Sequence, residues 1–359
     1  MADQRDTGIS WTDETWNPVV GCSIVSPACT NCYAMAMAAR IERMSGGKTH
    51  YAGTTKVVNG KPVWTGKLAL APDHILTAPL RWKRPRRVFV NSMSDLFHED
   101  MPEGWIDQVF AVMALSPQHT FQILTKRPER MRAYLTKDWA AAARRHVEEL
   151  TLPTFSKATA DTQDRLRRYT SPGFPHPLEN VWLGITAEDQ ARADERIPHL
   201  LATPAAVRFV SAEPLLGPIH FDFAPSHRHQ RDCAYVASQG PAPCTCNAAR
   251  NGLDWIIVGG ESGPGARPTH PDWVRSIRDQ CAAAGVAFHF KQWGDWVPCV
   301  LPKDGQWPTW TTTTREFCRV DDDGRRSTDG WPMQRVGKAR AGRNLDGQIH
   351  DAFPEARHD

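Results

Sequence analysis

Short apolar runs that end abruptly in polar or charged residues recur along this chain, and this repetition constrains the fold more than any other feature. Six runs rich in Val, Ile, Phe and Trp occupy residues 88–90, 121–124, 181–185, 207–210, 255–258 and 286–290, and the shorter run Val19–Val20 precedes Cys22. Apolar residues at helical spacing lie between several runs, as at 105–113 and 273–281. Strands that alternate with helices predict a parallel sheet, and seven such units predict an α/β fold, a partial or near-complete (β/α) barrel.

The domain organisation follows from length and composition. A chain of 359 residues with 41% hydrophobic residues can form one large barrel unit. We expect the barrel to span residues 1–294, with a cysteine loop at 21–33, inserted loops at 137–178 and 225–252, and a small irregular C-terminal appendage at 295–359. No apolar run approaches the ~18 residues of a membrane span, and the N-terminus lacks the apolar core of a signal peptide. Nine cysteines, an odd number, favour reduced thiols over a disulfide framework, so we expect a cytoplasmic protein without membrane association.

Charged side chains follow most of the predicted strands within a few residues. They are Asp95, Lys126, Glu188, Glu213, Glu261 and Lys291. Polar residues after a strand can simply be loop residues that face water. In (β/α) barrels, however, the active site lies at the carboxyl ends of the strands. Because these six residues follow separate strands and the cysteine loop does too, we predict that they share one pocket.

Three cysteines, Cys22, Cys29 and Cys32, form a C-x6-C-x2-C cluster after the first apolar run. Closed structural zinc sites and iron–sulfur clusters normally take four protein ligands, so a triplet indicates a metal centre with one open position. A cubane with one free iron explains the missing ligand better than zinc does. The alternative is that these are ordinary buried thiols, since free Cys is among the most buried residue types.

Two further segments carry ligand-type residues. Residues 81–87 contain five cations and Trp82, a composition that suits phosphate contact and base stacking but is also common on solvated surfaces. This basic run precedes a predicted strand, which places it at the opposite end of the barrel from the active site. Residues 225–252 include Cys233, Cys244 and Cys246, which could bind zinc on a small knuckle or belong to a flexible insert.

The order of motifs resembles the radical S-adenosylmethionine (SAM) superfamily, with spore photoproduct lyase and its relatives nearest. The cysteine triplet follows the first strand, Ser92-Met-Ser-Asp-Leu-Phe-His-Glu99 the second and Leu124-Thr-Lys-Arg127 the third. The superfamily's common spacing is C-x3-C-x2-C, so the first gap here is longer. An uncharacterised phage-borne and bacterial three-cysteine family is also resembled by four sequence segments, at residues 11–18, 210–218, 258–267 and 291–294.

The resemblance implies that Cys22, Cys29 and Cys32 hold a [4Fe–4S] cluster whose fourth iron binds SAM, with a reductase or flavodoxin as electron donor. The implied cofactor-binding residues are Tyr33 beside the cluster, Ser92, Ser94 and Asp95 at the methionine moiety, Thr186 or Glu188 near the ribose, and Glu213. On the substrate side we expect Lys126, Arg127, Lys291 and Trp293.

The function predicted from these observations is a radical SAM enzyme that abstracts hydrogen from a substrate, with a nucleic acid base as the leading guess. One alternative is a non-enzymatic nucleic-acid-binding protein with a structural zinc or iron–sulfur site. Another is a metal-dependent hydrolase that uses Glu213 and Glu261. The hydrolase is disfavoured because almost no His follows the predicted strands.

Overall fold

A computed structural model describes residues 7–137, 177–223, 252–299, 317–325, 327 and 330–354. Most of the two expected inserts, including the candidate zinc ligands Cys233, Cys244 and Cys246, lies outside the described residues. No helix in the described part of the chain has both the length and the apolar character to span a membrane.

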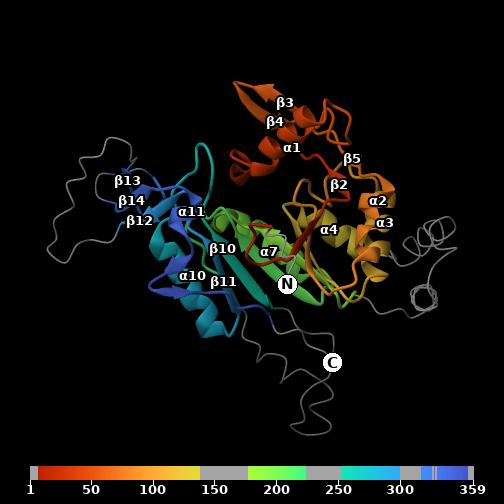
Figure 1. Ribbon diagram of the computed structural model, residues 1–359. Coiled ribbons are helices and arrows are strands. Elements are labelled where there is room, and N and C mark those ends of the chain that lie inside the picture. The colour runs from red at the N-terminus through yellow and green to blue at the C-terminus, as the bar shows by residue number, and fades with distance from the viewer. Residues whose placement is uncertain are drawn as a thin grey trace, which may run out of the picture.

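The central element is a seven-stranded parallel sheet that curls into a half-barrel (Figure 1). Its strand order is β1–β6–β7–β8–β9–β10–β11, and every neighbouring pair is parallel. The strands are β1 (Glu14–Trp16), β6 (Arg87–Val90), β7 (Thr120–Thr125), β8 (Val181–Thr186), β9 (Val207–Ala212), β10 (Trp255–Gly259) and β11 (Ala287–Gln292). The predicted mixed α/β fold with a partial barrel is therefore confirmed.

The first strand of the barrel is not the predicted one. The run Val19–Val20 forms β2, which pairs antiparallel with β5 (Ala69–Leu70) outside the main sheet. The barrel begins instead with β1, whose Trp16 is 1% exposed and packs against Phe121. Proline has no N–H to donate to a ladder, so Pro18 ends the pairing and directs Val19 out of the sheet.

Helices cover the outer face of the half-barrel. They are α3 (Glu103–Ala114) between β6 and β7, α4 (Pro128–Leu135) after β7, α7 (Gln190–Leu201) between β8 and β9, and α10 (Pro271–Ala284) between β10 and β11. Their apolar stripes join the outward-facing residues of the strands in one continuous core. This arrangement leaves the other face of the sheet as the barrel interior.

The interior is filled with aromatic side chains toward the amino ends of the strands. Its cluster contains Trp11, Phe89, Trp182, Val207, Phe209, Trp255 and Ile257. Successive side chains of a strand point to opposite faces, so the inward face of β9 continues with Ser211 and, just after the strand, with Glu213. The interior therefore changes from mainly aromatic to polar along the strands. Among the rings, the buried His289 and Gln122 are bonded to the Ser10 hydroxyl and the Trp11 carbonyl.

A long excursion between β1 and β6 carries the cysteine loop and lies above the sheet in Figure 1. It contains β2, η1 (Pro27–Cys29), α1 (Tyr33–Met44), the hairpin β3 (Thr55–Val58) and β4 (Lys61–Trp64), β5, α2 (Asp73–Leu76) and η2 (Ala78–Arg81). A small separate core around Val20, Met35 and Trp64 holds this excursion together.

The C-terminal part, expected to be irregular, contains regular structure in its described residues. Strands β12 (Trp296–Pro298), β14 (Trp331–Arg335) and β13 (Phe317–Val320) form an antiparallel sheet, followed by α11 (Lys338–Ala341) and the hairpin β15 (Asn344–Leu345) and β16 (Gln348–Ile349). The chain then runs beside β11, where Phe290 N–H donates to the His350 carbonyl over 2.9 Å. Its Phe353 ring packs against Trp255, which joins the tail to the barrel interior.

Gly184 tests the packing of the aromatic interior. A Cβ at this position would lie 2.4 Å from ring atoms of Phe209, which is fully buried. We expect Gly184→Ala to lower the free energy of unfolding by about 1–3 kcal/mol, because the ring has no space to withdraw. Urea unfolding measures the loss.

The matched control is Gly217→Ala, whose Cβ would meet Asp189 at an ordinary 3.5 Å. Equal urea concentrations at the unfolding midpoint for the two variants would contradict the tight packing of Phe209 over Gly184.

Candidate functional site

The cysteine loop, residues 21–33, begins at a glycine that no other residue can replace without displacement. Gly21 has φ +95°, and a Cβ there would lie 2.0 Å from the Lys67 carbonyl oxygen. Its N–H donates to the Met93 carbonyl over 3.2 Å. Both contacts fix the backbone that leads into Cys22, while α1 begins directly after Cys32 and fixes the other end.

The first anchor of the loop is Arg127, which follows β7. Its Nη2 donates to Ser23 Oγ over 2.7 Å, and Nη1 lies 3.9 Å from Cys22 Sγ. Nη1 also donates to Asp95 at 2.9 Å, and Nε contacts Glu99 at 2.8 Å. The guanidinium is almost buried and every nitrogen is engaged, so Arg127 positions the loop rather than facing open space.

Asp95 shares this network and is itself 5% exposed. One carboxylate oxygen accepts from the Thr125 hydroxyl at 2.6 Å and from Phe97 N–H at 3.0 Å. The other accepts from Lys126 N–H at 3.0 Å as well as from Arg127. Asp95 therefore ties the end of β7 to the segment after β6, and its hydrogen-bonding capacity is largely used within the protein.

The second anchor is Glu188, which follows β8 and is fully buried. Its carboxylate pairs with Arg196 Nη1 at 3.1 Å and accepts from the Ala28 N–H of the loop at 3.4 Å. Burial alone would raise the pKa of Glu188, but the Ser26 hydroxyl and the charges of Arg196 and Lys126 hold it below the ordinary value. The loop is thus attached to a buried ion pair.

The third anchor follows β10. Glu261 is 6% exposed and forms a two-pronged ion pair with Arg267, with distances of 2.6 and 2.9 Å. Asn31 Nδ2 donates to the same carboxylate over 3.1 Å, and Arg267 Nη2 donates to the Pro27 carbonyl over 3.1 Å. Both partners of this pair therefore hold the cysteine loop.

Between these anchors, Lys291 and Glu213 meet at the carboxyl end of the barrel interior. Lys291 Nζ lies 2.7 and 2.9 Å from the two carboxylate oxygens. A Cβ on Gly259 would lie 3.0 Å from the Glu213 carboxyl carbon, so glycine gives this carboxylate its space. Tyr33 donates its hydroxyl hydrogen to the Ser92 carbonyl over 2.9 Å. Burial of this hydroxyl raises its pKa, and the charges of Cys32 and Glu213 add smaller upward contributions.

The remaining predicted site residues are placed differently. Ser92 and Ser94 donate to Asn17 and to the Val19 carbonyl, beside the start of the cysteine loop. Thr186 is 2% exposed, and its carbonyl accepts from Arg196. Trp293 is not brought to this site, because its indole N–H donates to the Asn344 carbonyl at 2.8 Å and its ring is buried beside the C-terminal hairpin.

All three thiols of the loop are free. Burial, followed by the charge of Asp95, raises the pKa of Cys22 to about 12, while Arg127 acts in the opposite direction. Cys29 Sγ lies 3.9 Å from the Ser26 hydroxyl. Three free thiols on one loop fit the protein side of a three-thiolate metal centre.

The thiols are not arranged as a finished metal site. Within the described residues, no three Cys, His, Asp or Glu side chains converge in metal-binding geometry. Metal ligation requires thiolates, so binding of a metal by thiols releases protons. Binding here would therefore release the Cys22 proton and turn the sulfurs toward a common point.

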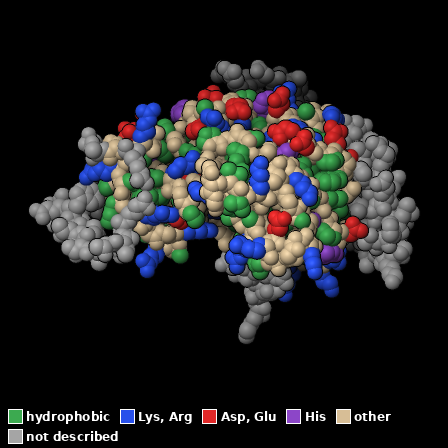
Figure 2. All heavy atoms as spheres, turned by 90° about the horizontal axis from the view of Figure 1, so that it is seen from above, with side chains coloured by type: hydrophobic (Ala, Val, Ile, Leu, Met, Phe, Trp, Pro, Cys, Tyr) green, Lys and Arg blue, Asp and Glu red, His purple; other side chains and the backbone are tan. Residues whose placement is uncertain are grey.

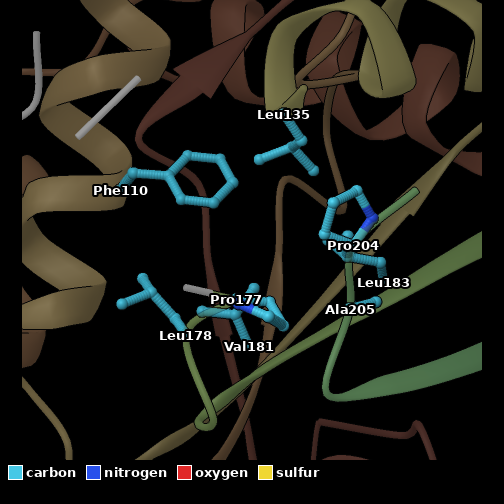
Figure 3. A pocket seen from close by; sticks show the side chains of 8 residues that line it. All are labelled: Phe110, Leu135, Pro177, Leu178, Val181, Leu183, Pro204 and Ala205. Carbon is cyan, nitrogen blue, oxygen red and sulfur yellow. The ribbon is translucent and has the colours of Figure 1, made fainter. Parts of the chain in front are cut away.

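The pocket in Figure 3 is not part of this site. It lies on the helix side of the sheet, where Phe110, Leu135 and Leu183 line it together with other apolar residues. It contains no titratable side chain, so it is a packing gap rather than a place for catalysis.

The basic run at residues 81–87 is partly used inside the protein. Arg86 and Arg87 form ion pairs with Glu14 and Asp13, at 2.5 and 2.9 Å, and the Arg87 guanidinium lies 4.2 Å from the Phe353 ring centroid. Figure 2 shows basic and acidic side chains interspersed over the described part of its face. Charge alone therefore does not identify a nucleic-acid surface here.

Several residues that hold the site were missed from the sequence. They are Ser23, Ser26, Arg196 and Arg267. The two serines could have been noticed, because they lie inside the cysteine loop. Arg267 ends the segment 258–267, which resembles the three-cysteine family. Nothing in the sequence around Arg196 indicates its role.

Arg196 provides a test of the second anchor. We expect Arg196→Met to lower the free energy of unfolding by about 3–5 kcal/mol at neutral pH, because it leaves a buried carboxylate without its cation. Since the folded-state pKa of Glu188 is below 4.5, its pair contributes stability above that value and loses it as pH falls through the folded pKa. The difference in unfolding free energy between wild type and Arg196→Met should therefore be smaller at acidic pH. Urea unfolding over a pH series measures it.

The control is Arg192→Met on the same helix, which removes a partly exposed pair with Asp189 at 3.5 Å. That change should cost about 0–1 kcal/mol. Equal losses for the two variants would show that the Glu188 pair does not support the structure.

Comparison with known proteins identifies a family but no characterised relative. No curated protein and no solved structure matches the sequence. The family described as "Protein of unknown function (DUF5131)" matches residues 6–354, which is nearly the whole chain. The protein therefore belongs to the DUF5131 family.

Proposed function

We propose that this protein is a radical SAM enzyme in which Cys22, Cys29 and Cys32 ligate a [4Fe–4S] cluster. The observation that carries the proposal is the attachment of the cysteine loop to three separate strand ends by Arg127, Glu188 and Glu261. This placement puts three free thiols at the carboxyl edge of a parallel half-barrel, where barrel enzymes hold their active sites.

The cluster, when bound, would supply the electron that cleaves SAM reductively and so provide the means to abstract hydrogen from a substrate. A reductase or flavodoxin would deliver that electron. The residues of the chain position the reactants: Arg127 places a cation beside Cys22 and favours its thiolate, and the aromatic interior closes the barrel below. Lys291 and Glu213 present a fixed pair of charges to the interior.

The first test removes one thiolate. Cys29→Ala should abolish cluster assembly, because two remaining thiolates are too few for a cubane. Anaerobically reconstituted wild-type protein should be brown, contain about four irons per chain and form 5′-deoxyadenosine from SAM under dithionite. Iron, sulfide and product analyses provide the readouts.

Cys281→Ala is the matched control, because Cys281 is fully buried on α10 within the main core. It should keep its iron and lose only packing. Full iron content in Cys29→Ala would refute the proposal, and a colourless wild-type protein that holds zinc without cleaving SAM would favour the nucleic-acid-binding alternative.

The second test concerns Lys126, whose charge reaches Glu188 while its backbone N–H holds Asp95. Lys126→Ala removes the charge but keeps the backbone contact. We expect SAM cleavage to slow by about 10²-fold with unchanged iron content. Lys137→Ala, which removes an exposed lysine just after α4, is the control. Loss of iron in Lys126→Ala would mean that this side chain supports the loop rather than the pocket.

A further inference from the structure

A second pocket lies outside the cysteine site, at the β1 edge of the half-barrel. It has a volume of ≈ 290 Å³ and is bounded by β1, by the chain that follows α1, and by α2 and η2. Small-molecule sites usually measure about 300–1,000 Å³, so this pocket suits a small, flat ligand. Its lining includes Asn17, His50, Tyr51, His74 and Trp82.

The lining offers flat rings and free ring nitrogens. The His50 and Tyr51 ring centroids are 4.7 Å apart. Burial, and then the charge of His74, lowers the pKa of His50, so its ring is neutral at physiological pH. No residue in the described part of the chain hydrogen-bonds to either imidazole, so both rings keep a donor and an acceptor for a ligand.

Cations follow Trp82 directly in the chain. Lys83 and Arg84 are exposed, and the Arg86 guanidinium lies 5.1 Å from the Trp82 ring centroid. Arg86 is already paired with Glu14, whereas Lys83 and Arg84, which directly follow the lining residue Trp82, are exposed to solvent. Flat rings beside solvent-facing cations are the combination that binds a base together with its phosphate.

The other end of the pocket is connected to the proposed active site. Asn17 Oδ1 accepts from the Ser92 hydroxyl at 3.1 Å and from Met93 N–H at 3.0 Å. The Ser92 carbonyl in turn accepts from Tyr33, the residue that follows Cys32. The pocket wall is therefore continuous with the segment that ends the cysteine loop.

We propose that this pocket binds a nucleoside phosphate unit of single-stranded nucleic acid, with the base against His50, His74 and Trp82 and the phosphate on Lys83 and Arg84. The pocket lies along the β1 edge of the half-barrel and uses none of the three cysteines. It gives the basic run a defined role that the run's charge alone does not establish.

The test is fluorescence anisotropy of the full chain with a labelled oligothymidylate of about 12 nucleotides. His50→Ala should weaken binding by about 5- to 150-fold, the range for one stacked base. The double variant Lys83→Ala/Arg84→Ala should weaken binding. It should also make the slope of log affinity against log salt shallower, by roughly the amount that two phosphate contacts contribute. Calorimetry with thymidine monophosphate separates the two possible ligands. Tighter binding of the oligomer than of the monophosphate is expected for a strand, whereas equal affinities would mean that the pocket binds a free nucleotide and would contradict the single-strand proposal.

The control Lys56→Ala/Lys61→Ala removes two exposed lysines from the β3–β4 hairpin and should leave affinity unchanged. Cys29→Ala should also bind normally, so this result is independent of the cluster proposal. Absence of binding by the wild type at physiological ionic strength, or equal affinities for the pocket variants and the hairpin control, would overturn the proposal.

Discussion

The Arg127 guanidinium is the contact on which the organisation of the carboxyl face depends. It comes from the end of β7, yet it reaches Asp95 and Glu99 after β6 and Ser23 within the cysteine loop. A buried cation is tolerated only when its donors are paired. Each of these partners is therefore held where the guanidinium requires it, and Cys22 is held beside it. The Glu188–Arg196 pair after β8 and the Glu261–Arg267 pair after β10 hold the cysteine loop in the same way.

The three anchors have a common design. In each, an acidic side chain near a strand end is neutralised by arginine: Asp95 by Arg127, Glu188 by Arg196, and Glu261 by Arg267. In each, a member of the pair also contacts the cysteine loop. The charged residues at the strand ends are thus mainly a frame for the loop, whereas Lys291 and Glu213 contact each other within the interior. Charged residues are therefore needed at these strand ends to hold the cysteine loop in place.

The interior of the barrel limits where a ligand can act. Trp11, Phe209 and Trp255 fill it toward the amino ends of the strands, and the C-terminal tail adds Phe353 to the same cluster. Burial of these rings stabilises the sheet and leaves no space for a ligand on that side. The polar positions then occur one or two inward residues further along, as with Ser211 on β9 and Glu213 just after it. Stability and reactivity are in this way separated along the same strands.

The sequence by itself determined the strand–helix alternation, six of the seven parallel strands and the polar character of their carboxyl ends, because burial patterns and strand chemistry are local. It also singled out the cysteine triplet by spacing. Only the tertiary structure decided that β1 rather than Val19–Val20 begins the barrel, since that depends on where Trp16 finds its partners. Likewise, the roles of Arg127, Asp95 and Trp293 depend on neighbours tens of residues away in the chain, such as Ser23 and Asn344. Long-range pairing of buried charges and polar groups leaves no periodic mark on a sequence, because any distant segment can supply the partner.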